Sequence, residues 1–254
     1  MSFSENISGP ALEERLLYLD NAVAVVQKLP GEVCSYVNGN SAEKAPYLPE
    51  FFSELPALQE TSHTKGGKIF LECVHRIDRP VSGCAVMART KEALAKVSGQ
   101  FTNHKVAHKK YWAIVEGIIP VSSEKALLED YLIFNTKKQK TFIVDENTRK
   151  AKKAQLYWRC AAAGERYSFI EIELLTGRTH QIRAQLANAG MHIKGDVKYG
   201  ARRSDTLDGI RLHAREVSFV SPDGNKPVTV ISPLPVMDPL WEACLNGIAP
   251  GESK

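Results

Sequence analysis

Five short stretches of strand-forming residues follow one another between residues 111 and 174, and they constrain the fold more than any other feature. Each is rich in β-branched or aromatic side chains, and the last alternates Ile170, Ile172 and Leu174 with glutamates. The short turns between them favour antiparallel neighbours. The pattern predicts strands over 111–116, 131–134, 141–144, 155–160 and 168–174. We therefore predict the α+β class, with a mixed, largely antiparallel sheet and flanking helices.

Apolar residues at helical spacing predict two helices. Val97 and Phe101 belong to a helical pattern over 91–102, and a second pattern covers 179–189. Prolines and glycines interrupt residues 38–68, for which we predict loops with one short helix.

Composition excludes disordered, fibrous and membrane-spanning classes. The chain has 254 residues, 43% of them hydrophobic and 24% charged, which is typical of a globular protein. No apolar run approaches the roughly 20 residues that span a bilayer, and the first residues lack the pattern of a signal peptide. We expect a cytoplasmic monomer that contacts no membrane. We predict one domain over 15–240, with an N-terminal extension over 1–14 and a C-terminal tail over 241–254.

The positive charge of the chain is concentrated in one window, residues 137–153. This window carries a net charge of +5, whereas the whole chain carries +4. A second basic cluster lies at 104–110. Such clusters are expected where a protein binds a polyanion, although lysines on a solvated hairpin give the same count. The basic residues of the window are Lys137, Lys138, Lys140, Arg149, Lys150, Lys152 and Lys153.

The segment VHRIDRPVSG, residues 74–83, surrounds one carboxylate with cations. Asp78 lies beside Arg76, Arg79 and His75, just before a turn that contains proline. One interpretation is an ion-pair cluster on a surface loop. The other is a carboxylate kept ionised by its cationic neighbours, as a nucleophile must be.

The segment LLTGRTHQIR, residues 174–183, places cations where a helix is predicted to begin. Arg178 and His180 would lie in its first turn, where positive charge opposes the helix dipole. An anionic partner would explain that arrangement. Arg183 follows about one turn later, and it could face a carboxylate from elsewhere in the chain.

Other chemistries lack their motifs. The five cysteines form no C-x-x-C pair and the histidines have no zinc-ligand spacing, so we predict neither a metal site nor a disulfide framework. No G-x-S-x-G nucleophile turn and no glycine-rich phosphate loop occurs, and we therefore expect no nucleotide cofactor.

Five blocks in order resemble the RluA-type pseudouridine synthases. HRIDRPVSG resembles that family's H-R-L-D-x-x-T-S-G motif, and the stretch from LLTGRTHQIR to GDVKYG resembles its T-G-R-x-H-Q-I-R signature with a later GD and YG. The other three blocks are LDNAVAVVQKLPG, KKYWAIVEG and RLHAREVSFVSP. Together they span most of residues 15–235.

The resemblance implies an enzyme that turns a uridine of RNA into pseudouridine without a cofactor or metal. It implies that Asp78 attacks either the ribose C1′ or the base C6, that Tyr111 stacks on the base and assists proton transfer at C5, and that Arg183 pairs with Asp78. Arg76 would fill the gap that the flipped nucleotide leaves. We expect further RNA contacts from His75, Arg178, His180, Gln181, Lys137, Lys138, Lys152 and Lys153.

The chain departs from the family pattern at Val81, where threonine is usual, and residues 1–15 are too short for the S4 RNA-binding domain that many relatives carry first. Ribosomal RNA and transfer RNA both remain open as the partner. Two other functions also remain open: a catalytically inactive RNA-binding or remodelling protein of the same fold, and an enzyme that binds a small phosphate compound with Arg178 and His180.

Overall fold

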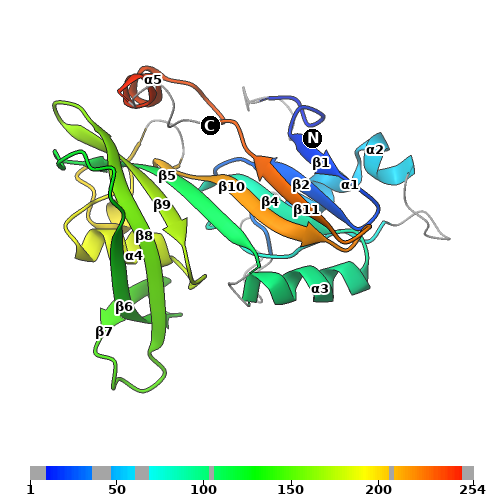
Figure 1. The fold of residues 1–254 in the computed structure, drawn as a ribbon, viewed down its shortest axis with the longest axis horizontal. Coiled ribbons are helices and arrows are strands. Elements are labelled where there is room, and N and C mark those ends of the chain that lie inside the picture. The colour runs from blue at the N-terminus through cyan, green and yellow to red at the C-terminus, as the bar shows by residue number, and fades with distance from the viewer. Residues whose placement is uncertain (1–9, 36–46, 61–68, 103–105, 206–208, 248–254) are drawn as a thin grey trace.

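The computed structural model describes residues 10–35, 47–60, 69–102, 106–205 and 209–247. In this part of the chain, eleven strands form one sheet in the order β1-β2-β4-β10-β5-β9-β8-β6-β7, with β11 beside β10 and β3 beside β4 (Figure 1). Only the β4–β10 pair is parallel among these strands. The strands are β1 Leu16–Leu19, β2 Val23–Lys28, β3 Glu72–Cys73, β4 Ser82–Ala88, β5 His108–Glu116, β6 Ala126–Asn135, β7 Lys140–Val144, β8 Lys152–Ala163, β9 Tyr167–Leu174, β10 Leu212–Ser221 and β11 Lys226–Ile231.

Helices cover both faces of the sheet. They are α1 Leu48–Ser53, α2 Pro56–Glu60, α3 Lys91–Thr102, α4 Gln181–Asn188 and α5 Pro239–Asn246, with a short 3-10 helix at Val197–Tyr199. Helices α1, α2 and α4 pack on one face, whereas α3 and α5 pack on the other. Alternate side chains of β2 enter the two apolar layers on either face of the sheet. Ala24 and Val26 face α1, while Val23 and Val25 face the cluster under α3. All six residues of β2 are buried, which explains its nearly continuous apolar sequence.

The sequence-based expectations for class and elements are largely confirmed. The sheet is mixed and mostly antiparallel, and each of the five expected strands is present and longer than expected. The helix expected over 91–102 is α3, and the Thr90 hydroxyl caps it by accepting from the Ala93 amide at 3.0 Å. The loop-rich segment holds two short helices rather than one; its residues 38–46 and 61–68 lie outside the described residues.

The segment that we expected to be a C-terminal tail begins inside helix α5. Asp238 caps this helix, and Trp241 and Cys244 are buried against the sheet. The Trp241 ring meets Phe169 of β9 edge to face, with 6.2 Å between the ring centroids. The packed part of the chain therefore extends to Asn246 rather than ending at 240.

Strand β10 joins the two halves of the sheet. It lies between β4 and β5, with β1 and β2 beyond one and β9, β8, β6 and β7 beyond the other (Figure 1). Ala214 of β10 lies opposite Gly83 of β4. Gly83 has a φ of +121°, and a Cβ atom there would lie 2.2 Å from the Ala214 carbonyl oxygen. The two strands can therefore approach this closely only because residue 83 is a glycine, which has no Cβ atom.

We expect Gly83→Ala to lower the free energy of unfolding by about 2–6 kcal/mol, because overpacking and a strained backbone each cost about 1–3 kcal/mol. Gly224→Ala is the matched control. Gly224 also has a positive φ, +71°, but a Cβ atom there would meet nothing within 4 Å. Urea denaturation of both variants measures the difference, and equal losses of stability would show that the close approach to Ala214 contributes nothing.

Candidate active site

The loop that carries Asp78 connects β3 to β4, and a buried lysine donates hydrogen bonds to its backbone. The Lys28 amine donates to the carbonyl oxygens of Leu29 at 3.0 Å, Arg79 at 3.1 Å and Val81 at 2.6 Å. Burial lowers the pKa of Lys28 to about 8. The bonds to Arg79 and Val81 fix the backbone on the C-terminal side of Asp78, whose side chain remains 22% exposed. The loop thus presents one carboxylate in a fixed position.

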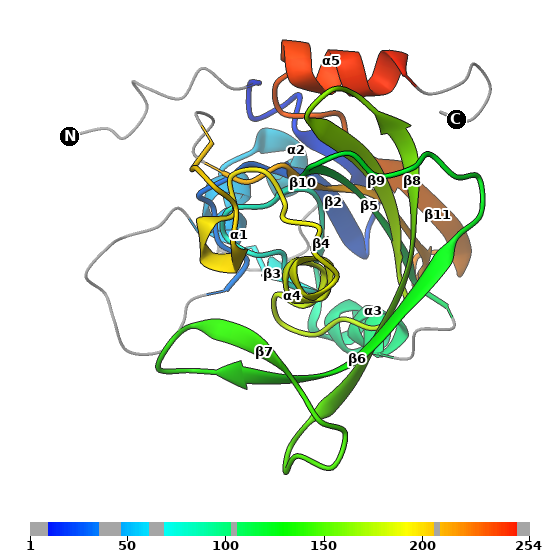
Figure 2. The same cartoon turned by 90° about the vertical axis from the view of Figure 1, so that its left-hand side faces the viewer.

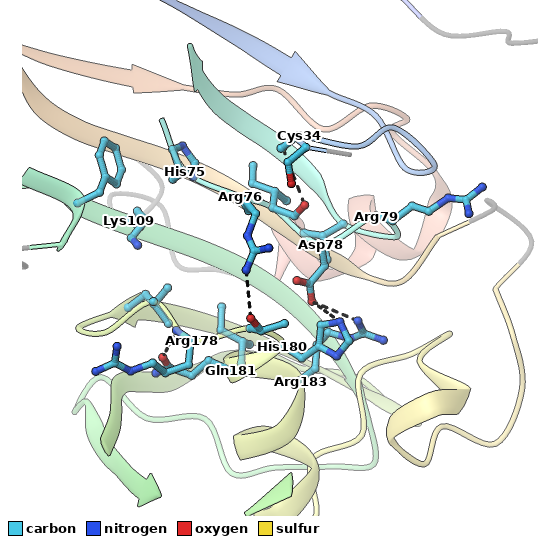
Figure 3. Close-up of a pocket in the computed structure, with 18 of the residues that line it drawn as sticks. Cys34, His75, Arg76, Asp78, Arg79, Lys109, Arg178, His180, Gln181 and Arg183 are labelled. Carbon is cyan, nitrogen blue, oxygen red and sulfur yellow. Dashed lines mark hydrogen bonds and ion pairs between the residues drawn. The ribbon is translucent and has the colours of Figure 1, made fainter. Parts of the chain in front are cut away.

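Arg183 of α4 joins Asp78 to a second carboxylate. Its Nη1 donates to Asp78 Oδ2 at 3.1 Å (Figure 3), while Nε and Nη2 donate to the two oxygens of Asp196 at 2.6 and 2.8 Å. Arg183 is 4% exposed and Asp196 is 1% exposed. The expected pair between Arg183 and Asp78 is confirmed. The bidentate bond to Asp196 fixes the plane of the guanidinium, and so the direction in which it holds Asp78.

His180 lies on the same side of Asp78 as Arg183. Its Nε2 is 3.8 Å from Asp78 Oδ2, and its Nδ1 is 2.9 Å from the Tyr199 hydroxyl. That hydroxyl accepts from the Thr141 amide at 2.7 Å, so its own proton is free to go to His180 Nδ1. Burial lowers the pKa of His180, so the ring is neutral at pH 7. When the Tyr199 hydroxyl donates to Nδ1, the ring proton lies on Nε2, which faces Asp78.

Arg178 and His180 do not lie in the first turn of a helix, contrary to the expectation from the sequence. Helix α4 begins at Gln181, and His180 precedes it in a left-handed conformation with φ of +53°. Neither cation therefore occupies the first turn. The left-handed residue turns the chain sharply, which brings the His180 ring back toward Asp78.

Tyr111 comes from β5, near the middle of the sheet. Its side chain is buried on the face that carries α4, and burial raises the pKa of its phenol. It lines the same cavity as Asp78, His180 and Arg183. The cavity measures about 890 Å³, and apolar side chains such as Leu212 form part of its wall. This volume is ample for a nucleoside with its flanking backbone.

Two expected RNA-binding arginines lie at the edge of the cavity, and among the described residues each uses one donor. Arg76 is exposed and bonds the Thr179 hydroxyl through Nη2 at 3.3 Å. Arg178 is exposed and bonds the Lys153 carbonyl through Nε at 3.1 Å. Both guanidinium groups therefore remain available to an incoming anion.

The structure gives His75 and Gln181 supporting contacts instead. His75 Nε2 accepts from the Val86 amide at 3.2 Å, its ring stacks on Phe101, and burial lowers its pKa to about 3, so it carries no charge. Gln181 uses its amide on four partners: Thr176, the Arg178 backbone, Gln155 and Gln185. These bonds fix the turn before α4 and leave the amide without spare capacity for RNA.

The basic window is divided between two turns of an arm formed by β6, β7 and β8, which curves past α4 (Figure 2). Lys137 and Lys138 are exposed in the β6–β7 turn, whose Thr136 lines the cavity. Lys152 is exposed at the start of β8, beyond the second turn. Lys153 pairs with Glu129 at 2.9 Å, so its charge is partly compensated.

Sequence reasoning did not single out Lys28, Asp196 and Tyr199. All three lie inside blocks on which the resemblance was based, Asp196 and Tyr199 in GDVKYG and Lys28 in VVQKLPG. The block pattern was thus the available signal, but it gave no geometry. Within the described residues, no three His, Cys, Asp or Glu side chains lie together as a metal site, and no helix is long and apolar enough to cross a membrane.

The family model that matches this chain is that of RNA pseudouridylate synthase, and the match covers residues 22–188. The chain belongs to this family. Ribosomal large subunit pseudouridine synthase C of Buchnera aphidicola subsp. Schizaphis graminum is 31% identical over 235 residues, which cover 89% of this chain and 68% of that protein. An uncharacterised RNA pseudouridine synthase of Zymomonas mobilis is 30% identical over 227 residues, covering 89% and 96%. The resemblance inferred from the five blocks is confirmed, and the protein is an RNA pseudouridine synthase by family.

Two solved human structures confirm the pseudouridine synthase fold. RNA pseudouridylate synthase domain containing 4 matches with a TM-score of 0.67 at 18% identity, covering 92% of this chain and 93% of its own. RNA pseudouridylate synthase domain containing 1 also has a TM-score of 0.67, at 20% identity, covering 94% and 90%.

Proposed function

We propose that this pseudouridine synthase isomerises uridines of ribosomal RNA and that Asp78 is its nucleophile. One observation carries the assignment: the Asp78 carboxylate is held at the cavity wall by Arg183, which Asp196 in turn holds rigid. The reaction breaks the N1–C1′ bond, turns the base within the site and forms a C5–C1′ bond. The proton on C5 moves to N1, so no cofactor is consumed.

The free oxygen of Asp78 supports a nucleophilic role. Arg183 bonds Oδ2 at 3.1 Å, and within the described residues no hydrogen-bond donor occupies Oδ1. Oδ1 is therefore the atom we expect to attack, at either C1′ of the ribose or C6 of the base.

Tyr111 and His180 are the groups that we propose for proton handling. C5 must lose its proton after the new carbon–carbon bond forms. Because burial raises its pKa, Tyr111 remains a neutral phenol, which can stack on the base and relay a proton by accepting one and donating another. With its proton on Nε2, the His180 ring can donate a hydrogen bond to the Asp78 carboxylate while the charge of that carboxylate changes during the reaction.

The substrate class is proposed from the relatives. The Buchnera relative is a ribosomal large subunit pseudouridine synthase by name. Mapping pseudouridines across total RNA, in cells with the protein, without it and with only Asp78→Asn, tests the proposal. We expect large-subunit ribosomal RNA to lose one or more pseudouridines in the last two cases. Loss from transfer RNA alone would overturn the substrate class, and no loss would overturn the function.

The exposed lysines of the window are expected to contribute to RNA affinity. Changing Lys137, Lys138 and Lys152 to Gln should raise KM more than it lowers kcat, and it should reduce the slope of log affinity against log salt by about 0.7 for each phosphate that is no longer neutralised. The control changes three exposed lysines outside the window, Lys91, Lys96 and Lys226. Equal effects in both triple variants would show that only net charge matters.

A further inference from the structure

The cavity extends past Asp78 to a second region beside α3. Phe101 and Thr102 of α3 line this region together with His75 and Lys109. Figure 3 shows Lys109 between His75 and Arg178, on the side of the cavity away from Arg183. None of the steps proposed above uses this region.

Lys109 is a buried cation that has no counterion among the described residues. The residue is 8% exposed, and no acceptor in the described chain lies within hydrogen-bond or ion-pair distance of its amine. The contact it does make is with the Phe101 ring, whose centroid is 5.5 Å away. Burial lowers the pKa of Lys109 to about 8, and no carboxylate offsets this shift. An amine that is buried, charged and unpaired is costly in the free protein, and an anion would remove that cost.

The neighbouring lysine, Lys110, does have an ionic partner. Lys110 points to the opposite face of β5, where its side chain is 52% exposed and its amine lies 2.9 Å from Glu216. Both lysines belong to the basic cluster at 104–110, of which residues 104 and 105 lie outside the described chain. The sequence could not distinguish Lys109 from Lys110, but the alternation of the strand does.

The charges that line the cavity favour an anion beside Lys109. Among the described lining residues, Asp78 is the one carboxylate, and Arg183 already pairs with it. Arg76 and Arg178 at the edge add further positive charge, and His75 is uncharged. The potential in the region beside α3 is therefore positive without compensation.

We propose that Lys109 binds a backbone phosphate of the substrate RNA adjacent to the target uridine. The inference rests on the proposed function and adds a phosphate subsite to it. Lys109 and Tyr111 project from the same face of β5 two residues apart, which places them about 7 Å from each other along the strand. A uridine stacked on Tyr111 would therefore bring its neighbouring phosphate, rather than its own base, to Lys109. Phe101 forms the apolar base of the subsite and Arg178 borders its open side.

The first test compares Lys109→Met with Lys110→Met, using the shortest RNA stem-loop that the wild-type enzyme converts. Lys109→Met should weaken RNA binding about tenfold, raise KM more than it lowers kcat, and reduce the salt slope by about 0.7. Lys110→Met should match the wild type, and Lys109→Arg should restore most of the affinity. Wild-type affinity and salt slope in Lys109→Met would overturn the proposal.

The second test alters the RNA and compares the wild type with Lys109→Met. Each phosphate of the stem-loop is replaced in turn by a neutral methylphosphonate, and binding is measured to the wild type and to Lys109→Met. One linkage next to the target uridine should weaken wild-type binding about tenfold and have no effect on Lys109→Met. The proposed subsite is wrong if no neutral linkage next to the target uridine weakens binding. It is also wrong if the losses of affinity from the neutral linkage and from Lys109→Met multiply. If the wild type converts no RNA at all, the proposed function itself fails.

Discussion

Asp78→Asn is expected to reduce pseudouridine formation by a factor of about 10⁴ or more. Asparagine keeps the size of the side chain and can still accept a hydrogen bond from Arg183, so the loop held by Lys28 should not move. It lacks the negative charge that attacks the sugar or the base. RNA affinity should not fall, because Asp78 repels phosphates rather than binding them. Quantifying pseudouridine in the target RNA after single-turnover incubation measures the loss.

The matched control for this result is Asp223→Asn. Asp223 lies in the β10–β11 turn, outside the cavity, where it accepts a hydrogen bond from Asn21 that an amide oxygen can also accept. Wild-type turnover is expected. An Asp78→Asn enzyme that still forms product at the wild-type rate would remove Asp78 from the reaction, whatever the control shows.

Arg183→Met is expected to impair both stability and activity. Asp196 is 1% exposed, and within the described part of the chain its side chain receives two hydrogen bonds, both from Arg183. Removing the guanidinium leaves this carboxylate buried and unpaired, which costs about 3–5 kcal/mol of unfolding free energy. Asp78 loses its partner in the same step, so turnover should fall even at temperatures where the variant is folded. Urea denaturation and single-turnover assays measure the two effects.

A double variant separates these effects. Asp196→Asn combined with Arg183→Met removes the buried charge, and it should therefore recover part of the lost stability. It should not recover activity, because Asp78 still lacks its positioning cation. Recovery of turnover in the double variant would show that Arg183 acts through stability alone.

The sequence predicted strands and one helix well because each signal was local. The expected strands are all present because side chains on alternate faces of a strand enter different cores, and α3 was predicted because its apolar face has helical period. The start of α4 was missed by two residues. The left-handed conformation of His180 depends on the bonds of its ring to Tyr199 and of Thr141 to the Thr179 carbonyl, which no local pattern records.

The site was predicted only in part, because motifs identify residues along the chain but not the contacts between distant segments. Motifs identified Asp78 and Arg183, and opposite charge made their pairing a natural expectation. The role of Asp196 could not be foreseen, because it requires the turn after α4 to return to that helix. For the basic window, the sequence shows the charges but not which of them are paired. Counting charges did not reveal that Lys153 is paired with Glu129 while Lys137 is exposed.

The position of β10 also determines the order in which this enzyme can form during synthesis. Asp78 belongs to the half of the sheet that contains β4, whereas Tyr111 and Arg183 belong to the half that begins with β5. The strand that joins these halves, Leu212–Ser221, is made after every other strand except β11. Until it leaves the ribosome, β4 and β5 each have an unpaired edge that could pair with another chain. A growing chain of this protein thus carries all its proposed catalytic residues before it can catalyse, and it depends on protection of those two edges in the interval.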